Sequence, residues 1–179
     1  MSLERAKEYL ESKGFGDRII ITEHSSATVE EAAEALGCEQ GMIVKTLSFL
    51  QGDQSVLILA EGTARVDNQK YKARFDCKAK MIPAEQVETL IGHDIGGVCP
   101  FGIKDGVTVY LDESIKKHTV VYPAASTNHS AVRLTVEELE SCCGAEGWVD
   151  VCKRTSTNSG ATFCRKMKRL CRPTSVRTP

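Results

Sequence analysis

The sequence has no long apolar run. Its longest ones, such as residues 56–60, are far too short to cross a membrane as a helix. The apolar core of a signal peptide is also missing, because residues 2–13 mix apolar and charged side chains as an amphipathic helix does. We therefore expect a cytoplasmic protein without membrane contact. Its 179 residues suffice for one globular domain with a real core and are too few for two.

Paired cysteine motifs are absent as well. The sequence contains eight cysteines, and no two of them are spaced as CxxC. Such pairs are the usual sign of a structural zinc site, so we predict no metal site and no cofactor, although a site assembled from distant residues stays open. Without a secretory signal, the cysteines are expected to be reduced thiols.

Familiar catalytic and RNA-binding signatures are missing too. There is no G-x-S-x-G of a serine hydrolase, no P-loop and no G-x-G-x-x-G. Nor does the chain contain the motifs of an RRM, a KH domain or a zinc finger. Any chemistry must therefore come from residues that the fold brings together.

Charge is distributed unevenly along the chain. Residues 153–179 carry eight basic and no acidic residues, which leaves residues 1–152 with 15 basic and 24 acidic residues. We predict one domain over residues 1–152 and a flexible basic tail over residues 153–179. The tail either binds RNA through its charge or is an incidental extension. An acidic domain does not suit a broad duplex-binding surface, so any nucleic-acid contact in it must be local.

One basic stretch interrupts the acidic domain. Residues 65–80 contain six basic and two acidic residues. Asp67 is placed to cap a short helix, and a strand is expected over residues 77–82. The candidate tRNA phosphate contacts on this helix are Lys70, Lys72 and Arg74. An ordinary solvated helix face is the alternative explanation.

The remaining pattern predicts helices interleaved with hairpins. Capping boxes at Thr28 and Thr135 begin two helices, and Pro83 begins another. Strands are expected over residues 19–22, 42–50, 55–60, 107–111, 119–122 and 131–134. Because no regular βαβ repeat is present, we expect a single α+β domain with a curved, mixed or antiparallel sheet and flanking helices.

Residues 91–102 are the most unusual stretch, reading I-G-H-D-I-G-G-V-C-P-F-G. Four glycines and a proline within twelve residues fit no helix or strand interior. The composition predicts a shaped loop whose backbone groups face a ligand, with an ordinary turn as the alternative. Cys99 in this loop either lines a pocket as a small apolar side chain or pairs with a histidine as a nucleophile.

Lys45 stands inside an apolar strand, with Val44 before it and Thr46 after it. It points either to solvent or into a cleft, where its ammonium group can hold an anion or an ester carbonyl, and periodicity does not separate the two. A third feature is the small and hydroxyl-rich run over residues 123–130, which includes Asn128 and His129. The lysine strand, the glycine-rich loop and this run could share one cleft.

Together these features resemble the YbaK/ProX family, the freestanding relatives of the editing domain of bacterial prolyl-tRNA synthetases. The resemblance covers roughly residues 2–152 and rests on four stretches: G-M-I-V-K-T-L at 41–47, G-H-D-I-G-G-V-C-P-F-G at 92–102, Y-P-A-A-S-T-N-H at 122–129, and V-R-L-T-V-E-E-L at 132–139. It implies a trans-editing aminoacyl-tRNA deacylase, which removes a wrong amino acid from the 3′ end of a tRNA, typically tRNA(Pro). The acceptor end of aminoacyl-tRNA and prolyl-tRNA synthetase are the partners it implies.

The resemblance also implies roles for individual residues. The family's essential lysine falls on Lys45, and its G-x-x-x-P loop falls on residues 96–100. The substrate-binding residues implied are His93, Gly96, Gly97, Val98, Cys99, Pro100, Ala125, Ser126, Asn128 and His129. Many relatives carry an aromatic residue at position 93 and serine at position 99, so the amino acid that is removed stays open. A non-catalytic module that binds tRNA ends and a thiol hydrolase using Cys99 are the alternative functions.

Overall fold

The computed structural model describes residues 2–23 and 27–154. Its helices are α1 (Ser2–Ser12), α2 (Val29–Leu36), α3 (Asn68–Phe75), α4 (Ala84–Ile91) and α5 (Val136–Cys142), and three short 3-10 turns are η1 (Gly16–Arg18), η2 (Gln40–Met42) and η3 (Glu113–Lys117). Its strands are β1 (Ile19–Ile21), β2 (Ile43–Gln51), β3 (Gln54–Glu61), β4 (Ala64–Val66), β5 (Thr108–Asp112), β6 (Val120–Pro123), β7 (Ser130–Val132), β8 (Leu134–Thr135), β9 (Gly147–Val149) and β10 (Cys152–Arg154).

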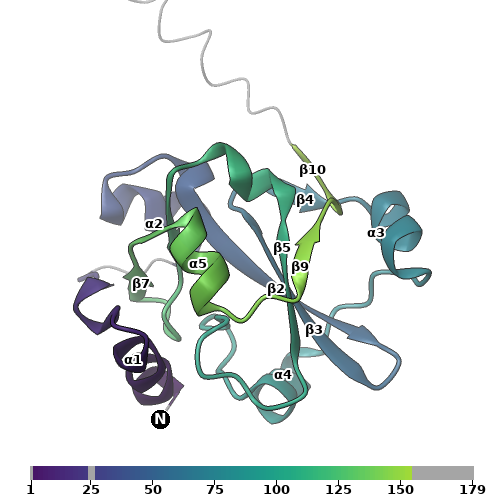
Figure 1. The fold of residues 1–179 in the computed structure, drawn as a ribbon, viewed down its shortest axis with the longest axis horizontal. Helices are drawn as coiled ribbons and strands as arrows, with labels where there is room; N and C mark the ends of the chain where they lie inside the picture. Colours follow the sequence, from purple (N-terminus) through teal and green to yellow (C-terminus); the bar gives the residue numbers. More distant parts are fainter. Residues whose placement is uncertain (1, 24–26, 155–179) are drawn as a thin grey trace, which may run out of the picture.

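The main sheet has six strands in the order β8-β6-β2-β3-β5-β9 (Figure 1). β2 and β3 form the expected antiparallel hairpin, with Gln51 opposite Gln54 at its closed end. β6 runs parallel to β2, β5 runs parallel to β3 and β9, and β8 is antiparallel to β6. Two short antiparallel pairs, β1 with β7 and β4 with β10, stand beside it. This mixed arrangement confirms the expected α+β fold.

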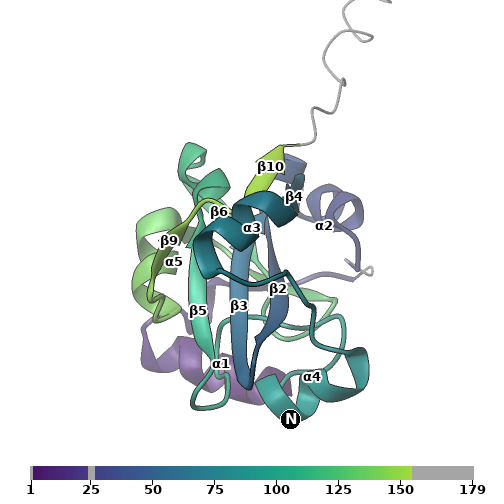
Figure 2. The same ribbon diagram turned by 90° about the vertical axis from the view of Figure 1, so that its right-hand side faces the viewer.

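Both faces of the main sheet are covered, so β3 is buried along nearly its whole length. Leu57 and Leu59 belong to the larger core, which α1, α4 and α5 complete on one face. Ile58 and Ala60 belong to a second core on the other face, where α3 packs. Figure 2 shows α3 in front of β3, with α5 to one side. The alternation of side chains along a strand thus divides β3 between two cores.

Helix boundaries follow the capping residues that the sequence indicates. Thr28 and Thr135 each form a capping box, the first at α2 and the second at α5. Asp67 caps α3 by accepting hydrogen bonds from the N–H groups of residues 69 and 70. α4 ends at Gly92, whose φ of 94° is a conformation that glycine adopts without strain. The glycine-rich loop therefore begins directly at the end of α4.

The prediction of a strand over residues 77–82 is wrong, because these residues form no regular strand. Within this described segment, the strand-like contact is an isolated bridge between Met81 and Phe49. Pro83 follows at once, and it has no N–H group with which to continue the pairing. As a result, the middle of the outer edge of β2, around Thr46, has no neighbouring strand among the described residues, between the pairing with β6 and the contacts with residues 80–82.

Two strand boundaries also differ from expectation. Residues 131–134 are divided between β7, which pairs with β1, and β8, which pairs with β6. At the C-terminal end, Lys153 and Arg154 lie in β10, which pairs with β4. The rest of the expected tail, residues 155–179, lies outside the described residues.

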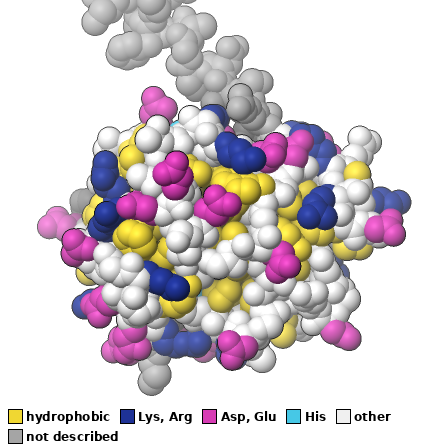
Figure 3. Space-filling model, viewed as in Figure 1, with side chains coloured by type: hydrophobic (Ala, Val, Ile, Leu, Met, Phe, Trp, Pro, Cys, Tyr) yellow, Lys and Arg dark blue, Asp and Glu magenta, His cyan; other side chains and the backbone are white. Residues whose placement is uncertain are grey.

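Charged side chains are intermingled on the face shown in Figure 3, where basic and acidic groups alternate around patches of apolar atoms. Within residues 2–23 and 27–154, no helix has the length and apolar character needed to pass through a membrane.

Candidate active site

A cavity of about 380 Å³ opens at the outer edge of β2. β6 pairs with β2 at Ile43 and Val44 and then diverges, which leaves the next residues of β2 facing the cavity. α2 and α4 lie on the same side of β2 (Figure 2), and residues of both helices line the cavity, which is open to solvent. Its lining residues include Lys45, Thr46, Ser48, Ile95, Gly96, Val98, Ala124, Thr127 and Ser130.

Lys45 is half-buried on β2 and is held by two backbone carbonyls. Its Nζ donates hydrogen bonds to the carbonyl oxygens of Gly62, at 3.0 Å, and Ala64. Burial lowers the pKa of Lys45, and the nearby Arg65 lowers it further, against the opposite effect of the Cys152 thiol. The structure therefore places this lysine at a defined position on the cavity wall, while its catalytic role stays a prediction.

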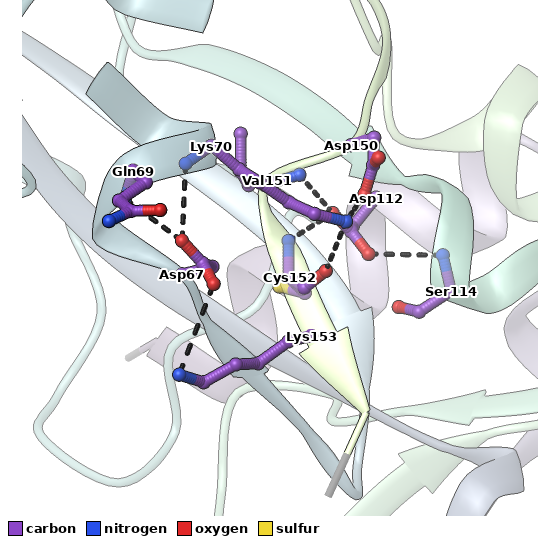
Figure 4. A network of polar contacts seen from close by, with 9 residues as sticks. All are labelled: Asp67, Gln69, Lys70, Asp112, Ser114, Asp150, Val151, Cys152 and Lys153. Atoms are coloured by element: carbon purple, nitrogen blue, oxygen red, sulfur yellow. Dashed lines mark hydrogen bonds and ion pairs between the residues drawn. The ribbon is translucent and has the colours of Figure 1, made fainter. Parts of the chain in front are cut away.

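The carbonyls that hold Lys45 are themselves supported from the C-terminal end of the domain. Ala64 lies in β4, which pairs with β10. β10 is anchored by the buried carboxylate of Asp112, which accepts hydrogen bonds from the N–H groups of Val151 (2.9 Å) and Cys152 (3.2 Å). Figure 4 shows this network beside the helix that carries Gln69 and Lys70. A continuous set of backbone contacts thus leads from Asp112 through β10 and β4 to the lysine.

Thr46 presents one hydroxyl group to the cavity that has no hydrogen-bond partner among the described residues. The Leu50 N–H group bonds to Lys80 (2.8 Å) and the Ser48 carbonyl accepts from Ile82 (3.1 Å), so alternate residues of β2 direct their backbone groups to this edge. Thr46 lies two residues before Ser48, so its backbone groups face the same edge of β2 as those of Ser48. Its Oγ1 is buried and has no hydrogen-bond partner among the described residues. A polar ligand in the cavity can supply that partner.

The glycine-rich loop and the small-residue run are in direct contact. Gly96 and Val98 line the cavity, whereas Gly97 is buried against Ser126. A Cβ added at Gly97 would lie 2.2 Å from the Ser126 carbonyl oxygen, so no larger residue fits without displacing the backbone. Ser126 itself has a φ of 74°, which is strained for a residue other than glycine. Close packing therefore fixes the two loops relative to each other.

Behind this contact lies a buried polar cluster of His93, Cys99 and Ser126. His93 Nδ1 is 2.9 Å from Ser126 Oγ, and its Nε2 is 3.7 Å from Cys99 Sγ. All three side chains are buried. Burial raises the pKa of the Cys99 thiol to about 12 and lowers the pKa of His93. A protonated, enclosed thiol is a poor nucleophile, and the cluster instead joins the two loops from behind.

Other predicted substrate residues occupy varied positions around the cavity. Pro100 and Ala125 are buried in the interior, Asn128 is half-buried and His129 is exposed. In their place, Thr127 and Ser130 line the cavity, with their hydroxyl oxygens 2.7 Å apart. The run over residues 123–130 indicated this wall, but only the turn geometry decides which side chains face inward. Substrate contact by any of these residues stays a prediction.

The basic residues predicted to contact tRNA lie on α3, over the second core. Lys70 forms an ion pair with Asp150 at 2.7 Å (Figure 4), and the Arg74 guanidinium lies over the ring of Phe75. Lys72 is exposed. None of Lys70, Lys72 and Arg74 lines the cavity at β2. Their contact with tRNA stays a prediction.

Sequence reasoning missed Thr46, Thr127 and Ser130. Thr46 follows Lys45 directly, and a hydroxyl residue in an apolar strand is a weak signal that the strand edge is unpaired.

No group of three or more His, Cys, Asp or Glu side chains placed to hold a metal occurs within the described part of the chain.

Residues 23–142, more than half of the chain, match the family described as "Aminoacyl-tRNA editing domain". The chain belongs to this family, which confirms the resemblance to YbaK-like proteins drawn from the lysine strand and the glycine-rich loop.

Individual relatives agree with this assignment. The chain is 42% identical over 154 residues to "Uncharacterized protein YwhH" of Bacillus subtilis (strain 168), with 86% of this chain and 98% of the relative covered. It is 30% identical over 121 residues to "Putative Cys-tRNA(Pro)/Cys-tRNA(Cys) deacylase EbsC" of Enterococcus faecalis (strain ATCC 700802 / V583), covering 66% of this chain and 73% of that protein.

A solved structure has the same fold. The structure described as "Crystal structure of a putative trans-editing enzyme for prolyl tRNA synthetase" matches with a TM-score of 0.77 and 33% sequence identity, and the match covers 85% of this chain and 97% of that one. The editing-domain architecture therefore extends over nearly the whole described part of the chain.

Proposed function

We propose that this protein hydrolyses the ester bond of mischarged aminoacyl-tRNA in trans, and that its substrate is tRNA(Pro) carrying a wrong small amino acid. The observation that carries the proposal is Lys45, anchored by two carbonyls on the wall of a cavity that the glycine-rich loop also lines. Membership in the editing-domain family and the names of the two tRNA-related relatives support it.

Lys45 supplies a fixed positive charge at the reacting ester. An ammonium group has three N–H donors, and two of them already bond to the Gly62 and Ala64 carbonyls. The third is free to bond to the ester carbonyl or to a phosphate of the acceptor end. Because the lysine is held before substrate arrives, it stabilises developing negative charge without having to reorient.

The glycine-rich loop provides the second half of the proposed mechanism. In this mechanism the backbone N–H groups of Gly96 and Val98, both residues of the cavity wall, stabilise the oxyanion as water attacks the ester carbon, with assistance from the vicinal ribose hydroxyl. The acyl C–O bond then breaks, which releases the free amino acid and restores the terminal hydroxyl of the tRNA. An aminoacyl ester is already activated, so positioning and charge stabilisation suffice for its hydrolysis.

Selectivity for a small amino acid follows from the apolar part of the cavity. Val29, Ala32 and Val87 are among its apolar lining residues. Such walls exclude larger side chains sterically, but they separate similar small amino acids by only about 1–3 kcal/mol per methylene. His93 and Cys99 act on this wall indirectly, since they lie behind the loop and set its shape. Binding to prolyl-tRNA synthetase stays a prediction.

A panel of mischarged tRNAs tests the proposal. We expect wild type to deacylate tRNA(Pro) carrying Cys, Ala, Ser or Thr with unequal rates, and Lys45→Met, which keeps the aliphatic stem, to lose at least about 100-fold in rate. Lys7→Met, a change at an exposed residue of α1, serves as the matched control. Thermal melting of each variant verifies that it is folded.

The outcomes separate the rival functions. Undiminished hydrolysis by folded Lys45→Met would overturn the proposed role of the lysine. Loss of activity in Cys99→Ala, without an effect of Lys45→Met, would support a thiol hydrolase. Tight binding of tRNA acceptor ends without turnover of any ester would support the non-catalytic module.

A further inference from the structure

A second cavity adjoins the first, and Lys45 lies on the wall of both. It has a volume of about 320 Å³, and it shares Thr28 and Val29 with the main cavity. Its remaining lining residues are Glu30, Gln40, Gly62, Thr63 and Arg65. Whereas the main cavity has extensive apolar walls, the second one is lined mostly by polar and charged residues. The two cavities therefore suit chemically different parts of one ligand.

The second cavity has an excess of positive charge. Lys45 and Arg65 contribute two cations, against the single carboxylate of Glu30. Arg65 is exposed, and no ion pair to it occurs among the described residues. It stands opposite Lys153 in the pairing of β4 with β10, and the Lys153 charge is already paired with Asp67 at 3.9 Å, which leaves Arg65 as the cation of this strand pair that faces the second cavity. This arrangement favours an anion at the cavity.

The connectivity of the substrate brings an anion to this place. In aminoacyl-tRNA, the terminal ribose bears the ester on one side and the last phosphodiester at its 5′ position. When the ester lies beside Lys45 in the main cavity, the phosphodiester is only a few bonds away. The second cavity begins at the same lysine. Arginine suits such a group, because its planar guanidinium donates two parallel hydrogen bonds to phosphate oxygens.

We propose that the second cavity binds the 3′-terminal phosphodiester of the tRNA acceptor end, with Arg65 as its principal anion-binding residue. The proposal rests on the proposed function for the identity of the ligand. It assigns recognition of the nucleic acid to β4, directly beside the ester-binding cavity. Recognition by β4 is separate from the contacts predicted for α3.

Two substrates that differ in the phosphodiester test this assignment. Deacylation of mischarged tRNA(Pro) is compared with that of the corresponding aminoacyl-adenosine, which has the ester and the ribose but no phosphate. For Arg65→Gln, we expect the ratio of kcat/KM for the tRNA to kcat/KM for aminoacyl-adenosine to fall about tenfold. The loss should lie in KM, and the slope of log KM against log salt should decrease by about 0.7.

A matched charge deletion controls for general electrostatic attraction. Lys7→Gln removes one positive charge from α1, at the other end of the molecule from β4 (Figures 1 and 2), and it should leave the substrate ratio unchanged. An unchanged ratio in Arg65→Gln, or an equal fall in Lys7→Gln, would overturn the proposal.

Failure of the proposed function has a different signature. In that case wild type hydrolyses neither substrate. Binding of the trinucleotide CCA without an attached amino acid then tests whether the second cavity binds phosphate. Weaker, less salt-dependent binding of CCA by Arg65→Gln than by wild type and Lys7→Gln would support the phosphate site. Equal binding by all three proteins would refute it.

Discussion

Replacement of Asp112 by asparagine offers a sharp test of how the lysine is supported. The Asp112 carboxylate is 1% exposed and accepts three backbone hydrogen bonds, from Ser114 at 3.0 Å, Val151 at 2.9 Å and Cys152 at 3.2 Å. Asparagine has nearly the same shape. It retains one carbonyl oxygen, however, and presents an NH₂ donor in place of the other acceptor.

The structure indicates the size of the effect. The favoured orientation turns the asparagine carbonyl toward the N–H groups of Val151 and Cys152, which leaves the Ser114 N–H group facing an NH₂ donor. A lost bond to a charged acceptor is worth about 1.5–3 kcal/mol, so we expect Asp112→Asn to lower the free energy of unfolding by about 1.5–3 kcal/mol. For a domain of this size, the melting temperature should fall by about 3–12 °C.

Urea unfolding and thermal melting measure this change, with Asp150→Asn as the control. Asp150 is an exposed partner of Lys70, and a surface pair of this kind is worth about 0–1 kcal/mol. A decrease for Asp112→Asn of less than about 1 kcal/mol, or one equal to that of Asp150→Asn, would refute the role of Asp112 as a buried hydrogen-bond acceptor. Because β10 pairs with β4, the folded fraction of Asp112→Asn should also deacylate more slowly than wild type.

Three further predictions concern the loop, the thiols and the lysine. Gly97→Ala should destabilise the protein by about 1–3 kcal/mol in urea unfolding, because its Cβ would lie 2.2 Å from the Ser126 carbonyl oxygen, whereas Gly147→Ala, which has open space, should not. At pH 8, a pKa of about 12 leaves about one Cys99 in ten thousand ionised, so mass spectrometry should detect alkylation of Cys99 only after unfolding; rapid native labelling would contradict its burial. The ¹³Cε resonance of Lys45 should titrate below the ordinary value of 10.5, and a value at or above 10.5 would contradict its burial. Between its folded and unfolded pKa values the unfolded chain binds more protons, so the contribution of Lys45 to stability should rise with pH across that window.

Features that depend on near neighbours in the chain were predictable from the sequence. Thr28 and Thr135 begin helices because a capping box needs only residues within one turn. The β2–β3 hairpin and the loop after Gly92 likewise follow from local turn chemistry. The strand expected at 77–82 failed because its pairing depended on β2, a distant strand that it meets at a single bridge.

The candidate site was predictable in part. Composition singled out the glycine-rich loop and the lysine strand, and the structure brings Lys45, Gly96 and Val98 to one cavity. Cys99 could be assigned as a pocket residue or as a nucleophile from sequence alone, because the sequence does not reveal which side of a loop is covered. Its burial depends on packing against His93 and the run over residues 123–130.

By itself, the sequence determined the α+β class, the helix caps, the hairpin and the family of this protein, because these depend on local patterns and on motifs read in order. Tertiary structure decided where the lysine points and what holds it. The carbonyl of Ala64 lies 19 residues from Lys45 in the chain, and β10, which pairs with the strand of Ala64, lies still farther along the chain. Such contacts are set by the packing of whole elements, so only the folded chain reveals Lys45 between an apolar cavity and a polar one.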